Sequence, residues 1–154
     1  MAMALLLRKG FREEDFAFLH PGGKLGKRFL RVRDLMHSGE QIPIVAPTTS
    51  MHDVIYEMSK KGFGITAVAT NGVIDGVISD GDLRRLLQKD EHILRKTAAD
   101  CMKPNPATVD AGEMASVALQ QMEQLHITSL FVADESRRLE GIIHLHDLWG
   151  LELF

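Results

Sequence analysis

Hydrophobic and polar positions follow two periods along the chain, one typical of helices and one typical of strands. Between residues 51 and 58, apolar side chains recur at helical spacing and would form one face of a helix. The segments ITAVAT (65–70) and VIDGVIS (73–79) have the composition of strands, and the Asn71-Gly72 pair between them is the strongest short signal for a hairpin turn. A second amphipathic pattern follows at once. This part of the chain therefore predicts a helix, a hairpin and a second helix.

The same order of elements recurs in the second half of the chain, so the sequence contains an internal repeat. A single unit of this size buries too little apolar surface to be stable alone. We therefore predict an α/β (α+β) fold of two β-α-β-β-α units packed sheet to sheet as a pseudo-two-fold pair, with the helices outside. The matching segments are 32–36 with 98–102, 45–70 with 109–134, and 76–83 with 141–148.

Composition narrows the class of protein. The chain has 154 residues, of which 45% are hydrophobic and 25% charged, as in an ordinary soluble globular protein. Its net charge of −3 argues against a general nucleic-acid binder. The apolar run near the start, MAMALLL, is too short to span a bilayer and is followed, not preceded, by basic residues, which is the wrong order for a secretory signal. The single cysteine, Cys101, fits a reducing compartment. We expect a cytoplasmic protein without nucleic-acid or membrane partners.

A candidate ligand site lies where the second strand of the hairpin ends and the next helix begins. Ser79 closes the strand, and Asp82 falls in the first turn of the helix, where a carboxylate can accept hydrogen bonds from two adjacent ribose hydroxyls. Backbone N–H groups at the helix start, with Gly81 allowing close approach, can bind a phosphate. Arg84 and Arg85 can add charge-assisted hydrogen bonds to phosphate oxygens. The same Ser-x-x-Asp spacing is also an ordinary capping box, so a purely structural role stays open.

Apolar strand edges in the first unit are candidates for holding the base of a nucleotide. We expect the base to lie between Ile44–Val45 and Ile78, where backbone groups can bind its polar edge.

The second unit has a different residue at the corresponding strand end. His144 stands where the first unit has Ser79, and only Asp147 is kept, so we expect a weaker ribose site in the second cleft. The two histidines His144 and His146 could bind zinc together with Asp147, but no further ligand is signalled nearby, and we predict no metal. A polar rim of the second cleft is the expected role of these side chains.

The repeat resembles a tandem cystathionine-beta-synthase (CBS) domain pair, also called a Bateman module. The resemblance is carried by VRDLM, PIV, VIYEM, ITAV and GVISDGDL in the first unit and by AADCM, ALQQM, SLFVAD and LEGIIHLHDL in the second. In that family, clefts between paired units bind nucleotides, most often adenine nucleotides. A Ser/Thr-x-x-Asp step, which falls here on Ser79 and Asp82, holds the ribose. The resemblance implies a nucleotide ligand and no required cofactor.

The N-terminal stretch GFREEDFAFLHPGGKLGKRFLRVRDLMH is similar to the D-arabinose 5-phosphate isomerase family of Gram-negative bacteria, as are ISDGDLRR and HITSLFVAD. This resemblance implies that residues 1–31 end a sugar-isomerase domain, 32–92 form the first CBS unit and 93–154 the second. His20 matches a histidine at the isomerase active site, but the substrate-binding core would lie upstream, so we expect no isomerase activity from this chain alone. Because that family feeds synthesis of the lipopolysaccharide sugar Kdo, a cytidine monophosphate (CMP) sugar is a second candidate ligand.

Two classes of function stay open at this point. One is a regulatory module that binds a nucleotide and adjusts an attached isomerase. The other is a structural or oligomerising appendage without a physiological ligand. A homodimer is expected in either case, because we expect two units alone to leave two apolar helical faces uncovered. These faces are formed by Leu83, Leu86 and Leu87 and by Leu145, Leu148 and Trp149.

Overall fold

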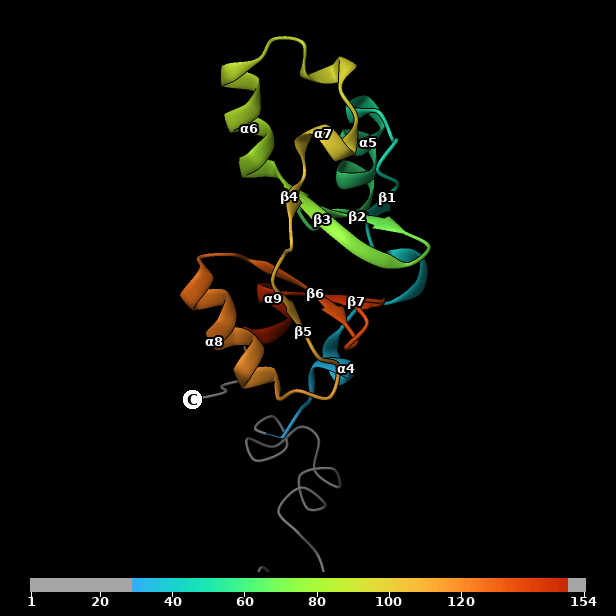
Figure 1. Ribbon diagram of the computed structural model, residues 1–154. Helices are drawn as coiled ribbons and strands as arrows, with labels where there is room; N and C mark the ends of the chain where they lie inside the picture. Colours follow the sequence, from blue (N-terminus) through green and yellow to red (C-terminus); the bar gives the residue numbers. More distant parts are fainter. Residues whose placement is uncertain (1–28, 150–154) are drawn as a thin grey trace, which may run out of the picture.

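Two β-sheets face each other at the centre of the molecule, and helices cover their outer sides (Figure 1). The structure is a computed structural model and describes residues 29–149. Within these residues, three α-helices lie on the outer side of each sheet. The elements are α4 (Val32–Leu35), β1 (Ile44–Val45), α5 (Met51–Lys61), β2 (Ile65–Thr70), β3 (Val73–Ser79), α6 (Asp80–Lys89), α7 (Ala98–Cys101), β4 (Lys103–Pro104), β5 (Thr108–Val109), α8 (Ala115–Leu125), β6 (Ser129–Ala133), β7 (Leu139–His144) and α9 (Leu145–Leu148), with short 3-10 helices at Gly39–Gln41 and Ile93–Arg95.

The two sheets have the same topology in their first three strands. In the order β1-β2-β3-β4, β1 runs parallel to β2, and β2, β3 and β4 pair antiparallel. In the order β5-β6-β7, β5 is parallel to β6, and β6 is antiparallel to β7. The predicted pair of β-α-β-β-α units, packed sheet to sheet, is confirmed. A shared core of apolar side chains lies between the sheets and includes Ala67, Ile74, Phe131 and Ile142.

Local sequence signals account for the ends of these elements. Asn71 and Gly72 both have positive φ, 52° and 82°, which matches a two-residue hairpin turn between β2 and β3. At the start of α5, the hydroxyl of Ser50 accepts a hydrogen bond from the backbone N–H of Asp53. The helix ends at Gly62, whose φ of 79° is the left-handed conformation that terminates helices.

The short helix that leads into each repeat packs on the other repeat's sheet. Val32 of α4 is fully buried in a core cluster with residues of β5, α8, β6, β7 and α9. Cys101 of α7 is buried in the corresponding core of the first repeat, and β4 pairs with β3. The packing of these two helices therefore crosses the boundary that the sequence predicts between 32–92 and 93–154.

The segment that leads into each repeat packs on the sheet of the other repeat, and we call it the exchanged segment. Each exchanged segment lies directly against a glycine of the sheet that it covers. A Cβ atom added to Gly76 would come within 2.6 Å of Met102 Sδ and 2.7 Å of the Lys103 carbonyl oxygen. A Cβ atom added to Gly141 would come within 2.7 Å of the His37 carbonyl oxygen. Both glycines are thus required by close approach of another backbone.

The expected exposed helical faces are only partly present. Leu83 and Leu148 are buried, because each points into the core of its own unit. The prediction that they belong to an uncovered face is wrong. Leu87 and Trp149 are 51% and 59% exposed and remain available on the surface.

Candidate functional site

The strand-to-helix step from β3 to α6 places Ser79 and Asp82 against each other. The Ser79 hydroxyl accepts a hydrogen bond from the Asp82 backbone N–H at 3.2 Å. In return, Asp82 Oδ2 accepts hydrogen bonds from the backbone N–H and the hydroxyl of Ser79, at 3.0 and 2.8 Å. The capping box that the spacing allowed is therefore formed. It fixes the orientation of the Asp82 carboxylate, which is only 6% exposed.

Two cations neutralise this buried carboxylate. Arg85 Nη2 lies 2.7 Å and Lys103 Nζ 3.0 Å from Asp82 Oδ1. Burial raises the pKa of Asp82, but hydrogen bonds from Lys103, Ser79 and Arg85 outweigh this effect and lower the pKa to about 2. Asp82 is therefore ionised at neutral pH and is a strong acceptor for hydroxyl groups.

Asp82 forms the polar end of a pocket of about 300 Å³, which we call the Asp82 pocket. Its other walls are largely apolar, a composition that suits a flat base with a ribose directed at the carboxylate. The lining residues are Ile65, Val77, Ser79, Asp82, Lys103, Pro104, Asn105, Pro106, Ala107, Leu125, Ile127, Ser129 and Phe131.

A second pocket, of about 360 Å³, adjoins the Asp82 pocket at the start of α6, and we call it the Arg84 pocket. The two pockets share Ile65, Ser79, Ile127 and Ser129, so a ligand can extend from one into the other. Gly81, Arg84, His126 and Thr128 line this pocket, as does the acidic Asp80. The arginine and the helix start can bind a phosphate here.

The residues that were expected to hold the base lie elsewhere. Ile78 is fully buried and Val45 nearly so, both in the core beneath the helices of the first repeat. Ile44 lies on β1, at the opposite edge of the sheet from β4. None of these three lines either pocket, so this prediction is wrong.

The physical reason is that the Asp82 pocket lies between the two repeats. Its apolar wall comes from residues 104–107, which lead into β5, and from Ile127 and Phe131 of the second repeat. Residues 105–107 directly precede β5 (Thr108–Val109), and β5 is the counterpart of β1 (Ile44–Val45) in the first repeat. The internal repeat is therefore the sequence signal that identifies residues 105–107 as candidates for the pocket wall.

The second repeat holds its acidic residue in a related way. Asp147 Oδ2 accepts a hydrogen bond from the His144 backbone N–H at 2.8 Å, and both carboxylate oxygens lie 3.1 Å from His37 Nε2. His144 Nδ1 accepts a hydrogen bond from the His146 backbone N–H at 3.0 Å. His37 thus takes the place that Lys103 has beside Asp82. Sequence periodicity did not predict either basic residue, although each directly follows the methionine of a matching motif, DLM or DCM.

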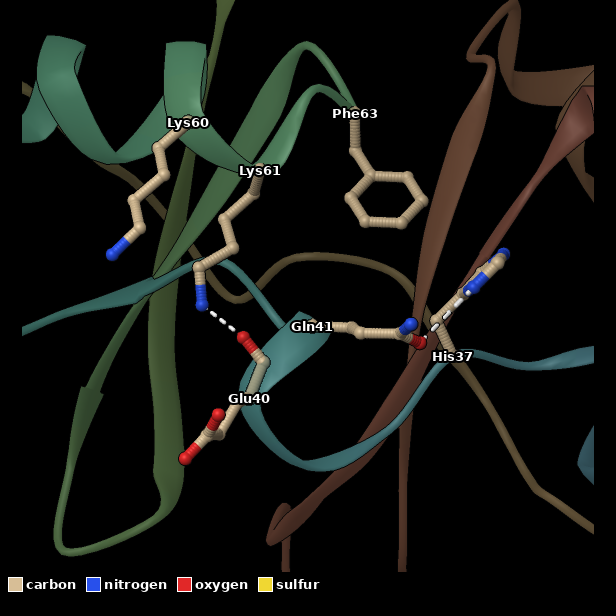
Figure 2. A pocket seen from close by; sticks show the side chains of 6 residues that line it. All are labelled: His37, Glu40, Gln41, Lys60, Lys61 and Phe63. Carbon is tan, nitrogen blue, oxygen red and sulfur yellow. Dashed lines mark hydrogen bonds between the residues drawn. The ribbon is translucent and has the colours of Figure 1, made fainter.

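The second cleft, beside Asp147 and His37, contains a pocket of about 760 Å³ that is larger and more polar than the Asp82 pocket. Figure 2 shows the ring of Phe63 over this hollow, with the ammonium of Lys61 turned toward the carbonyl oxygen of Glu40, to which it donates a hydrogen bond. Lys61 and Phe63 occupy the positions that Leu125 and Ile127 have in the first cleft. The charged side chain of Lys61 thus replaces an apolar side chain of the pocket wall. The pocket is lined by His37, Glu40, Gln41, Lys60, Lys61 and Phe63.

The histidines of the second cleft form a stack of rings. The rings of His144 and His146 lie parallel with centroids 4.7 Å apart, and His146 meets Trp149 edge-on at the same distance. Burial lowers the pKa of His144, and the neighbouring His146 and His37 lower it further against the opposing effect of Asp147. Within residues 29–149, no group of three or more His, Cys, Asp or Glu side chains is arranged to hold a metal ion.

His20, the residue matched to an isomerase active site, lies outside the described residues. In the part of the chain that the structure describes, no helix has the length and apolar character needed to cross a membrane.

Comparison with known proteins agrees with this architecture. The sequence profile described as CBS domain matches residues 32–89 and 98–148. Arabinose 5-phosphate isomerase KdsD of Francisella tularensis is 44% identical over 154 residues, which cover 99% of this chain and 47% of that protein. The KdsD protein of Escherichia coli K12 is 43% identical over 150 residues, with 96% and 45% covered. The chain thus spans about half the length of these curated relatives.

Solved structures show the same fold. The CBS domain protein PAE2072 of Pyrobaculum aerophilum, which was solved in complex with AMP, has a TM-score of 0.70 and 22% identity, and the match covers 80% of this chain and 98% of that one. Together with the profile match over both repeats, the exchanged leading helices and the paired sheets show that this chain belongs to the CBS domain family.

Proposed function

We propose that this chain is a regulatory CBS pair that binds a nucleotide and thereby adjusts an attached arabinose 5-phosphate isomerase. Such an enzyme would convert ribulose 5-phosphate to arabinose 5-phosphate for Kdo and lipopolysaccharide synthesis in the cytoplasm. The observation that carries the nucleotide site is the buried, ionised carboxylate of Asp82 at the end of an apolar pocket. The attached enzyme is supported by the identity to KdsD proteins over nearly the whole chain.

The ligand would extend through the two adjoining pockets. The base lies against Ile127 and Phe131 in the Asp82 pocket, and the ribose hydroxyls bind Asp82 beside Ser79. The phosphate lies in the Arg84 pocket, at the start of α6. Adenine nucleotides are the first candidates, because a structural neighbour was solved with AMP. A CMP-sugar is the second candidate, since it would be the activated end product of the proposed pathway. Its binding would provide feedback to the isomerase.

Calorimetric titration of AMP, ATP, CMP and a CMP-sugar tests this proposal. Asp82→Asn should weaken binding of the preferred ligand by about 1.5–3 kcal/mol, the free energy of hydrogen bonds to a charged group. Asp147→Asn is the matched control, because His144 replaces the serine in that cleft and its pocket wall is polar. If none of the four ligands binds below millimolar concentration, or if Asp82→Asn leaves affinity unchanged, the nucleotide site is ruled out.

The alternative function is that of an oligomerising appendage. The exposed Leu87 and Trp149 favour it, since large apolar side chains on a surface often mark contacts between proteins. A closed homodimer would cover them in two symmetric copies. Light scattering at tens of micromolar should then give twice the chain mass, and Leu87→Ser should shift the mass toward that of a monomer. A monomeric wild type would exclude the dimer.

A further inference from the structure

The Asp82 carboxylate is already saturated with hydrogen bonds. Oδ2 accepts two from Ser79, and Oδ1 accepts one each from Arg85 and Lys103 at 2.7 and 3.0 Å. An ionised carboxylate offers about four acceptor positions in all. Ribose hydroxyls can therefore bind Asp82 only if some of the present donors leave.

The donors differ in how easily they can leave. Ser79 belongs to the capping box, and its backbone N–H is fixed by the turn from β3 into α6. Arg85 and Lys103 are long side chains that are 61% and 65% exposed, whereas Asp82 is held at 7% side-chain exposure. Each cation keeps most of its side chain in water and can leave Oδ1 without being desolvated, while a ribose hydroxyl that replaces it keeps the buried carboxylate hydrogen-bonded. The Oδ1 side is thus the one that opens to a ligand.

Neither cation lines the Arg84 pocket, where the phosphate is proposed to bind, but both lie next to it. The Arg85 guanidinium is 3.4 Å from the position of a Cβ atom on Gly81, which lines the Arg84 pocket. Lys103 lines the adjoining Asp82 pocket. A cation released from Oδ1 therefore remains next to the path of a 5′-phosphate and can form a new charge-assisted hydrogen bond.

We propose that Lys103 determines specificity for phosphorylated over unphosphorylated nucleosides. The ribose hydroxyls replace Lys103 and Arg85 at Asp82 Oδ1, and the released cations bind the phosphate of the ligand. A nucleoside without phosphate also displaces the cations but offers them no anion, so its binding is weak. This inference rests on the nucleotide site proposed above and adds the residue that selects among its ligands.

The test compares AMP with adenosine, and CMP with cytidine, by calorimetry on the wild type and Lys103→Met. In the wild type, the nucleotide should bind about tenfold or more tightly than the nucleoside, the effect of losing one charge-assisted hydrogen bond. In Lys103→Met, the nucleotide should lose about tenfold while the nucleoside binds as well as before or better, because Asp82 is less occupied. Lys96→Met is the matched control: Lys96 pairs with Asp90 at 2.9 Å and lines neither pocket, so both affinities should stay unchanged.

Two results would overturn the inference while leaving the nucleotide site intact. One is an equal loss for nucleotide and nucleoside in Lys103→Met, which would mean that Lys103 only supports the position of Asp82. The other is a wild type that binds nucleoside and nucleotide equally well. By contrast, no binding of any of these compounds to the wild type would contradict the proposed function itself, and Asp82→Asn should weaken both members of each pair.

Discussion

Lys103 lies 3.0 Å from Asp82, although the two residues belong to different copies of the internal repeat. The equivalent contact in the other half joins His37 to Asp147 at 3.1 Å, again between copies. Each acidic residue at a helix start therefore receives its basic partner from the segment that leads into the other repeat. These segments also pack against the sheet glycines. The same packing between repeats therefore completes both clefts.

The ion pairs of Asp82 should make folding stability depend on acidic pH. Its pKa is about 2 in the folded protein and 3.8 ordinarily, so the folded state binds this proton less readily than the unfolded state. The resulting contribution of about 2 kcal/mol is complete above about pH 5 and is lost as the pH falls toward 2. Urea unfolding should show Asp82→Asn less stable than wild type by roughly that amount at pH 7, with a smaller difference at pH 3.

Asp53 provides the control for this measurement. It occupies the position in α5 that Asp82 has in α6, but its side chain is 69% exposed. Asp53→Asn should change stability by less than about 0.5 kcal/mol at either pH. A difference for Asp82→Asn that stays constant from pH 7 to pH 3 would contradict the assignment to its carboxylate.

The close approach at Gly76 should make this position intolerant of a side chain. In Gly76→Ala, the new methyl group would meet the Lys103 carbonyl oxygen and Met102 Sδ, so β4 must shift away from β3. Such overpacking costs about 1–3 kcal/mol, which denaturant unfolding can measure. Gly112→Ala is the control, because its nearest neighbour is a side-chain oxygen of Asp110 at 3.3 Å that can move. Equal stabilities of the two variants would exclude the tight contact.

Sequence patterns predicted the elements and the capping box because both depend on residues close together in the chain. The Ser79–Asp82 pair and the Asn71-Gly72 turn are of this kind. Ile78 was misassigned because successive side chains of a strand point to opposite faces: Val77 faces the other sheet and lines the Asp82 pocket, while Ile78 faces the helices. Lys103 could not be assigned from periodicity, since its contact depends on the exchange of segments between repeats.

His144 of the second cleft should add a pH dependence near neutrality. The pKa of His144 lies below its ordinary 6.5, so the unfolded state binds this proton more readily. Stability from this group is complete above pH 6.5 and falls as the pH decreases below it. His144→Ser should therefore lose less stability than wild type between pH 7.5 and 5.5, as followed by fluorescence of Trp149, the chain's one tryptophan. His52→Ser is the control, since the His52 side chain is 77% exposed; an unchanged slope in His144→Ser would contradict the assignment.

The apolar wall of the Asp82 pocket should contribute to binding of the base. Leu125 lines this pocket at the end of α8 and is 47% exposed, so replacing it costs little folding free energy. Leu125→Ser should weaken nucleotide binding by about 1 kcal/mol, or about fivefold in Kd, because it removes apolar surface from contact with the base. Val117→Ser on the same helix is the matched control: Val117 is 39% exposed and lines none of the three pockets described above. Calorimetry with AMP on both variants decides the matter. Equal affinities would place the base outside the Asp82 pocket, whereas a loss confined to Leu125→Ser would support the assignment of the first cleft, with its apolar wall, as the nucleotide site.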